Sequence, residues 1–129
     1  MSAALESPPR NVAGLMEMVR EPRTPYLSPT RFAKLAGLSM QSLAGLAGVH
    51  RNTISHHPES PKVQEALRAM LKVISAATEI TGDTDRAICW FMNEPIVDYR
   101  HRTAAELVAA GHSDAVMIFL DGLLIGATG

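Results

Sequence analysis

Hydrophobic residues recur at intervals of three and four along most of this chain, which is the spacing of one face of a helix. The longest such pattern covers residues 61–81. Its apolar stripe is formed by Val63, Leu67, Met70, Ile74 and Ala77, broadened by Ala66, Val73 and Ile80. A stripe of this width is typical of a helix that faces a core, and it is also long enough to form a subunit contact. Both interpretations stay open at this point.

Caps, prolines and glycines mark where the predicted helices begin and end. Ser28–Pro29 and Ser60–Pro61 each combine a capping residue with a proline in the first turn, and the two helices that they open are predicted to stop at Gly37 and Gly82. Further helices are expected over 39–47 and 50–57, from Asp83 or Thr84 through Phe91, from Thr103 to Ala110, and from Ser113 onward. No segment reads as a strand, so the sequence predicts an all-α fold.

The two ends of the chain differ from this regular pattern. Residues 1–10 contain the adjacent Pro8 and Pro9 and are expected to be disordered, and Asn11 would cap a short helix that stops before Pro22. Residues 1–27 are therefore predicted to be a flexible N-terminal segment with one possible short helix. The last helix is apolar nearly all round, which indicates a helix that is either buried in its own domain or waiting for a partner.

Residues 43–55 predict two short helices that meet at a tight turn, as in a helix-turn-helix. Ala44 is small where the helices cross, Gly48 allows the positive φ that such a turn requires, and Val49 and Ile54 can pack the corner into a small core. This arrangement leaves a polar set facing outward: Arg51, Asn52, Ser55 and His56. Arginine can address guanine, asparagine can pair with adenine, and serine can reach a phosphate or a base edge.

The charge distribution supports a DNA-binding interpretation of this corner. Residues 28–57 contain Arg31, Lys34 and Arg51 and no acidic residue, whereas residues 58–129 carry ten acidic and six basic residues. A local positive face beside an acidic remainder suits contact with phosphate on one side only, so Arg31 and Lys34 are predicted phosphate contacts. Three charges are few, and dimerisation would double them. A purely structural helical corner is the alternative.

Composition excludes several other classes of protein. The chain is 47% hydrophobic but only 5% aromatic, which favours a helical core over strands. No apolar run is long enough for a membrane span, and the first residues lack the basic and apolar regions expected of a signal peptide. The single cysteine fits a reducing cytoplasm, where Cys89 is expected to be a small buried hydrophobic residue. The five histidines form no metal-ligand pattern, and no catalytic or cofactor motif is present. We expect no enzyme, no metal and no cofactor.

The C-terminal half contains a further pattern: Trp90, Pro95, the run 102–108, Gly111, Val116, Leu120 and Gly126. In order and spacing it resembles the toxin-binding domain of the Xre–ParS antitoxins, the partners of RES-domain toxins. The resemblance covers about residues 60–127, and the helix-turn-helix half of that family would cover 28–58. Two positions depart from the pattern, since Ala104 replaces a usual proline and Ile96 replaces a frequent asparagine. Trp90 itself is expected to be the one large aromatic residue of the core.

The resemblance implies an antitoxin that binds a RES-domain, NAD-consuming toxin and represses its own operon on double-stranded DNA. Domain boundaries follow at 1–27, 28–58 for DNA binding, and 59–129 for toxin binding and dimerisation, with a homodimer or a toxin–antitoxin hetero-oligomer as the assembly. The predicted toxin contacts are Arg100, Arg102, Leu123 and Gly126. An arginine side chain would occupy the toxin pocket that binds the phosphates of a dinucleotide. The alternative is a stand-alone helix-turn-helix regulator with a helical dimerisation domain.

Overall fold

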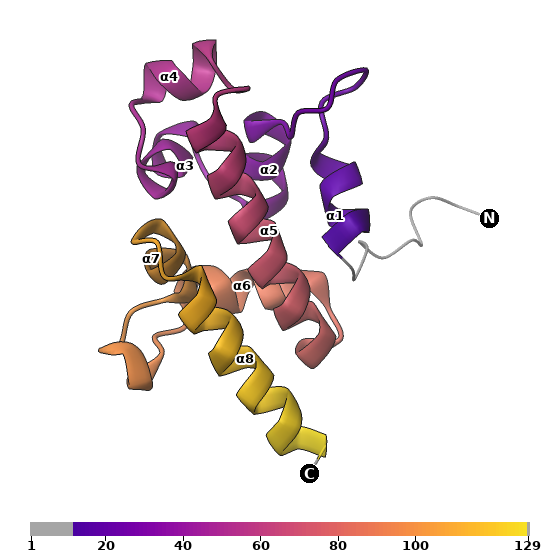
Figure 1. Cartoon of the computed structure of the whole chain (residues 1–129), viewed down its shortest axis with the longest axis vertical. Coiled ribbons are helices and arrows are strands. Elements are labelled where there is room, and N and C mark those ends of the chain that lie inside the picture. The colour runs from indigo at the N-terminus through magenta and orange to yellow at the C-terminus, as the bar shows by residue number, and fades with distance from the viewer. Residues whose placement is uncertain (1–11, 129) are drawn as a thin grey trace, which may run out of the picture.

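The computed structural model describes residues 12–128, so the expectations for residues 1–10 and for Asn11 lie outside the described residues (Figure 1). The α-helices are α1 Val12–Val19, α2 Pro29–Ala36, α3 Met40–Ala47, α4 Arg51–His56, α5 Pro61–Thr81, α6 Thr84–Asn93, α7 Ala104–Ala109 and α8 Ser113–Thr128. A short 3-10 helix, η2 Val97–Tyr99, lies between α6 and α7. Residues 12–128 contain no strand, which confirms the predicted all-α class. None of the helices in this range is both long and apolar enough to cross a membrane.

The 21-residue helix α5 is the centre of the fold (Figure 1). It contacts α1, α2, α3, α6, α7 and α8, and the side chains of Val63, Leu67 and Ile74 have no exposed surface. Helices of the same chain therefore cover the apolar stripe predicted over 61–81. Truncation of Leu67 or Ile74 to alanine would cost about 2–5 kcal/mol, because the rigid surroundings would leave a cavity.

The buried hydrophobic residues form one cluster, which runs from Leu15 in α1 to Leu120 in α8. Helix α5 packs against helices on both sides of the predicted boundary between residues 58 and 59. The core is consequently continuous across that boundary.

Most helix boundaries follow from local capping chemistry. The Ser28 hydroxyl accepts a hydrogen bond from the Arg31 backbone N–H over 3.1 Å, with Pro29 in the first turn, as predicted. Thr103 and Glu106 cap α7 reciprocally in a capping box. Ser60 differs from the prediction: its hydroxyl makes no capping bond, and its Oγ is buried without a hydrogen-bond partner among the described residues. The start of α5 is therefore favoured by Pro61 alone of the two predicted signals, because the fixed φ of proline suits a first helical turn.

A buried amide connects the N-terminal elements to α5. Gln64 is 3% exposed, and it exchanges two hydrogen bonds of 2.9 Å with the backbone of Leu27. Its Nε2 also donates to the Pro58 carbonyl over 2.8 Å. One side chain thereby holds together the loop before α2, the loop after α4 and the first turns of α5.

Two predictions about single side chains are corrected. Cys89 is exposed on α6, because the buried face of that helix is formed by Ala87, Ile88 and Phe91. Trp90 is only partly buried and packs against the edge of the core, whereas Phe32 and Phe91 are fully buried. The large aromatic residues of the core are therefore two phenylalanines.

Candidate functional site

The turn between α3 and α4 has the geometry that the sequence predicts. Gly48 adopts φ 70° and ψ 31°, in the left-handed region where glycine has no steric cost. The Gly48 N–H donates to the Gly45 carbonyl over 3.2 Å, and the Val49 N–H donates to the Ala44 carbonyl over 3.0 Å. These bonds satisfy the last carbonyls of α3. Ala44 and Ile54 are buried at 2% and 1% exposure, so both helices of the corner are anchored in the core.

Two histidine side chains form hydrogen bonds with the backbone of helix α4, which the sequence analysis did not predict. The His50 Nδ1 accepts a hydrogen bond from the Asn52 backbone N–H over 3.1 Å, which caps the helix. An accepting Nδ1 requires a neutral imidazole with its proton on Nε2. His56 Nδ1 lies 2.9 Å from the Asn52 carbonyl. Both imidazoles thus use one nitrogen for the helix and leave the other for an external group.

The four residues that we predicted to read DNA are all exposed on α4: Arg51, Asn52, Ser55 and His56. The side chains of Arg51 and Asn52 have no ion pair or side-chain hydrogen bond within residues 12–128. They are consequently available to an external partner. A helix of six residues is about 9 Å long, enough to reach a few base edges.

Arg31 and Lys34 lie in a different environment from the residues of α4. They line a cavity of about 450 Å³ together with Met18, Val19 and Leu35, so they face α1. Helix α4 packs on α3. The six predicted DNA contacts thus form two groups, one on α4 and one beside α1.

The second candidate region is the loop between α6 and α7. The Ile96 N–H donates to the Arg102 carbonyl over 2.9 Å, and the Ile96 carbonyl accepts hydrogen bonds from the N–H groups of Tyr99 and His101. Arg100 and His101 adopt φ 59° and 62°, in the left-handed region that non-glycine residues rarely occupy. Each such residue costs about 1–2 kcal/mol, and the surrounding hydrogen bonds hold the conformation in place.

Tyr99 fastens this loop to α8. Its hydroxyl donates to the Ala115 carbonyl over 3.2 Å, and its ring meets Phe119 edge to face with centroids 6.3 Å apart. Neither contact could be predicted from local sequence patterns, because each joins residues that lie 16 or more positions apart along the chain.

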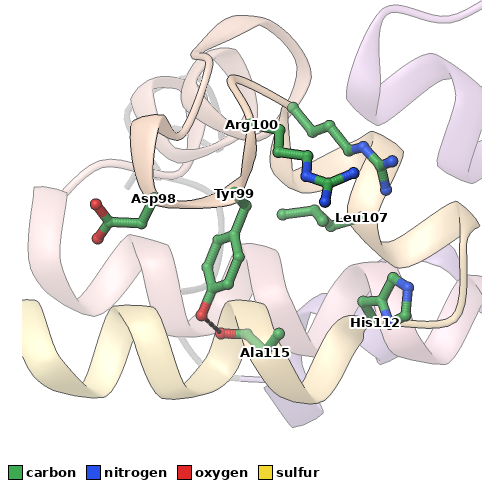
Figure 2. Close-up of a pocket in the computed structure, with 7 residues that line it drawn as sticks. Asp98, Tyr99, Arg100, Leu107, His112 and Ala115 are labelled. Carbon is green, nitrogen blue, oxygen red and sulfur yellow. Dashed lines mark hydrogen bonds between the residues drawn. The ribbon is translucent and has the colours of Figure 1, made fainter.

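A cavity of about 300 Å³ opens beside the loop (Figure 2). Its lining comprises Asp98, Tyr99, Arg100, Arg102, Leu107, His112 and Ala115. In Figure 2 the Arg100 guanidinium group lies beside Leu107, whereas the Asp98 carboxylate points away from Arg100. The structure therefore brings the two predicted toxin-contact arginines, Arg100 and Arg102, to one cavity and adds Tyr99 and His112, which the sequence analysis missed.

The carboxylate of Glu106, on α7, is hydrogen-bonded to Thr103. Glu106 Oε1 accepts hydrogen bonds from the Thr103 N–H over 3.0 Å and from its hydroxyl over 3.1 Å. These bonds, with a smaller contribution from the Arg102 charge, hold the pKa of the Glu106 carboxyl below its usual value. Neither Arg100 nor Arg102 forms an ion pair within the described part of the chain.

The other two predicted toxin contacts, Leu123 and Gly126, lie farther along α8. Leu123 is eight residues beyond Ala115, or about 12 Å along the helix, and both residues lie outside the cavity lining. Among residues 113–126 of α8, the buried side chains are those of Val116 and Leu120, in the first part of the helix. Exposed apolar side chains continue along the helix at Ile118, Leu123, Leu124 and Ile125, and Figure 1 shows this end projecting past the other helices.

Residues 12–128 include no group of three or more His, Cys, Asp or Glu side chains placed to hold a metal ion. Comparisons with protein-family models, with curated proteins and with solved structures found no match.

Proposed function

We propose that this chain is an antitoxin of the Xre–ParS type, which neutralises a RES-domain, NAD-consuming toxin and represses its own operon. The observation that carries the proposal is the joint position of Arg100 and Arg102 at one cavity on a hydrogen-bonded loop, where neither guanidinium group forms an ion pair with any of residues 12–128. The family resemblance assigns toxin binding to this same part of the chain.

The neutralising contact would be steric and electrostatic. A guanidinium group forms paired hydrogen bonds with phosphate oxygens, so Arg100 or Arg102 can occupy the part of a toxin pocket that binds the phosphates of NAD. Exposed Ile118, Leu123 and Ile125 offer a separate apolar contact farther along α8. Such a contact blocks an enzyme without any catalytic group on the antitoxin.

The DNA-binding half of the proposal rests on α4. Arg51 and Asn52 are exposed and without side-chain partners among the described residues, and Gly48 holds α4 at a tight corner behind them. We assign base reading to Arg51, Asn52, Ser55 and His56. Because Arg31 and Lys34 face α1, their role would be phosphate contact at the edge of the site.

Co-expression tests the antitoxin role. The proposal predicts that a RES-domain protein is encoded beside this chain's gene. That protein is expressed alone and together with the chain, and growth and complex formation are measured. Rescue of growth and a co-purifying complex are expected, with rescue lost in the double variant Arg100→Ala/Arg102→Ala. The matched control is Arg68→Ala/Arg86→Ala, which removes two exposed arginines of α5 and α6 and should still rescue. Absence of both rescue and complex with the unaltered chain overturns the proposal.

A gel-shift titration on the region upstream of the gene tests the DNA role. Arg51→Ala/Asn52→Ala should abolish binding at moderate salt, whereas Arg100→Ala/Arg102→Ala should bind normally. Unchanged binding by the α4 variant removes this helix from the DNA interface.

The exposed apolar end of α8 also fits a second candidate, a stand-alone regulator that dimerises through a helical domain. In that case Leu123→Glu would convert the chain to a monomer and weaken DNA binding, while the co-expression experiment would give no complex.

A further inference from the structure

We propose that the cavity between the 96–103 loop and the start of α8 binds the phosphate groups of a small molecule, with Arg100, Arg102 and His112 as its donors. A nucleoside diphosphate or free pyrophosphate has the required chemistry. This inference concerns the isolated chain and does not depend on the existence of a protein partner.

The first argument is the balance of charge at the cavity. Two guanidinium groups and one imidazole line it, and Asp98 is the only acidic residue in the lining. The Asp98 carboxylate points away from Arg100 (Figure 2). Glu106 is held by Thr103 in the capping box. The two guanidinium groups at the cavity are consequently not neutralised by an ion pair with any carboxylate of residues 12–128.

The second argument is that the loop is already in place without a ligand. Arg100 and His101 stay at positive φ because the Ile96 backbone bonds to Tyr99, His101 and Arg102, and because Tyr99 is fixed to Ala115. Residues held in sparsely populated backbone regions concentrate at binding sites, where the surrounding structure maintains them. A loop fixed in this way loses little additional entropy when a ligand binds.

The third argument is the match in size and number of donors. A single carboxylate offers two oxygens, whereas two guanidinium groups and one imidazole offer more N–H donors than two oxygens can accept. The volume of about 300 Å³ exceeds what a carboxylate would fill and is at the lower end for small-molecule sites. Leu107, Ala115 and Tyr99 add apolar surface for the remainder of the ligand. A diphosphate-bearing molecule therefore fits better than an acidic side chain.

Titration of the full chain with pyrophosphate and with ADP, followed by NMR chemical shifts, tests the proposal. We expect saturable shifts centred on residues 99–102, 107 and 112 with both probes, and none with adenosine. The main variant is Arg100→Gly, which removes the guanidinium group while glycine tolerates the positive φ. Its affinity should fall by about tenfold or more, the loss typical of a charged hydrogen-bonding partner. The matched control is His101→Gly, which makes the same backbone change at a residue that does not line the cavity and should bind as the unaltered chain does.

Three results would overturn the proposal. The first is an absence of saturable shifts with either probe at about 10 mM, which is roughly the weakest dissociation constant that a specific small-ligand site would show. The second is an equal loss of binding in Arg100→Gly and His101→Gly, which would indicate that the shared backbone change, and not removal of the guanidinium group, causes the loss. The third is binding of succinate as tight as that of pyrophosphate, which would indicate a site for carboxylates.

Discussion

The side-chain amide of Gln64 pairs with the backbone of Leu27 in both directions. The Leu27 N–H donates to Oε1 and Nε2 donates to the Leu27 carbonyl, each over 2.9 Å. The same Nε2 donates to Pro58, just beyond α4. This one residue therefore links the α1–α2 connection to the segment that carries the candidate DNA-reading helix.

Replacement of this amide should destabilise the fold. Gln64→Leu keeps a buried side chain of similar size but leaves the backbone groups of Leu27 and the Pro58 carbonyl without partners. We expect the free energy of unfolding in urea to fall by about 3 kcal/mol or more, because three groups lose their partner and each unsatisfied group costs about 1–3 kcal/mol. Gln41→Leu, at an exposed position of α3, should change it by less than about 0.5 kcal/mol. Equal effects of the two substitutions would contradict this role of Gln64.

Two glycines of the helical corner should respond to alanine in opposite directions. Gly48 lies at φ 70°, where an added Cβ is strained, so Gly48→Ala should destabilise the chain by about 1–2 kcal/mol. Gly45 lies inside α3 with open space around an added Cβ, so Gly45→Ala should stabilise it by about 0.5–1 kcal/mol. Thermal unfolding of the two variants checks the pair. A stabilised Gly48→Ala variant would show that the corner does not have this conformation.

The capping box of α7 predicts an acid-dependent contribution to stability. The pKa of Glu106 is lowered from 4.5 in the folded chain, chiefly by its hydrogen bonds to Thr103. This contribution is therefore fully present above pH 4.5 and is lost as the pH falls through the lower, folded pKa. An NMR titration of the Glu106 side-chain carboxyl carbon measures that pKa directly. Thr103→Ala should move it back toward the usual value, and a carboxyl that titrates at or above 4.5 in the unaltered chain would contradict the capping geometry.

The hydroxyl of Tyr99 should stabilise the 96–103 loop. Tyr99→Phe retains the edge-to-face contact with Phe119 but loses the hydrogen bond to Ala115. We expect a loss of about 0.5–1.5 kcal/mol and faster amide hydrogen exchange at Tyr99 and His101. Tyr26→Phe, at a tyrosine that is 41% exposed, is the matched control and should change neither quantity. Unchanged exchange in Tyr99→Phe would mean that other contacts fix the loop.

The sequence was a good guide where structure depends on neighbouring residues. The starts at Ser28–Pro29 and Thr103 and the turn at Gly48 were predicted because a cap or a positive φ needs only a few adjacent residues. The pairing of Gln64 with Leu27 could not be predicted, since 37 positions separate the two residues. The left-handed Arg100 and His101 also had no signal, because neither is a glycine or an asparagine.

The two candidate sites also differ in how much of their geometry the sequence could predict. The outward direction of Arg51 and Asn52 follows from helical spacing around the buried Ile54. The common cavity of Arg100 and Arg102 required the structure, because the loop that forms it is closed by Ile96 and anchored by Tyr99 on another helix. Their assignment as toxin contacts came from the family resemblance, and it remains a prediction.

The most direct test of the central claim is the rate of NAD consumption by a purified RES-domain protein, which the proposal predicts to be encoded beside this chain's gene. Equimolar chain should abolish that rate, Arg51→Ala/Asn52→Ala should inhibit equally well, and Arg100→Ala/Arg102→Ala should inhibit at least about tenfold less strongly. An unchanged rate of NAD consumption in the presence of excess unaltered chain would contradict the account.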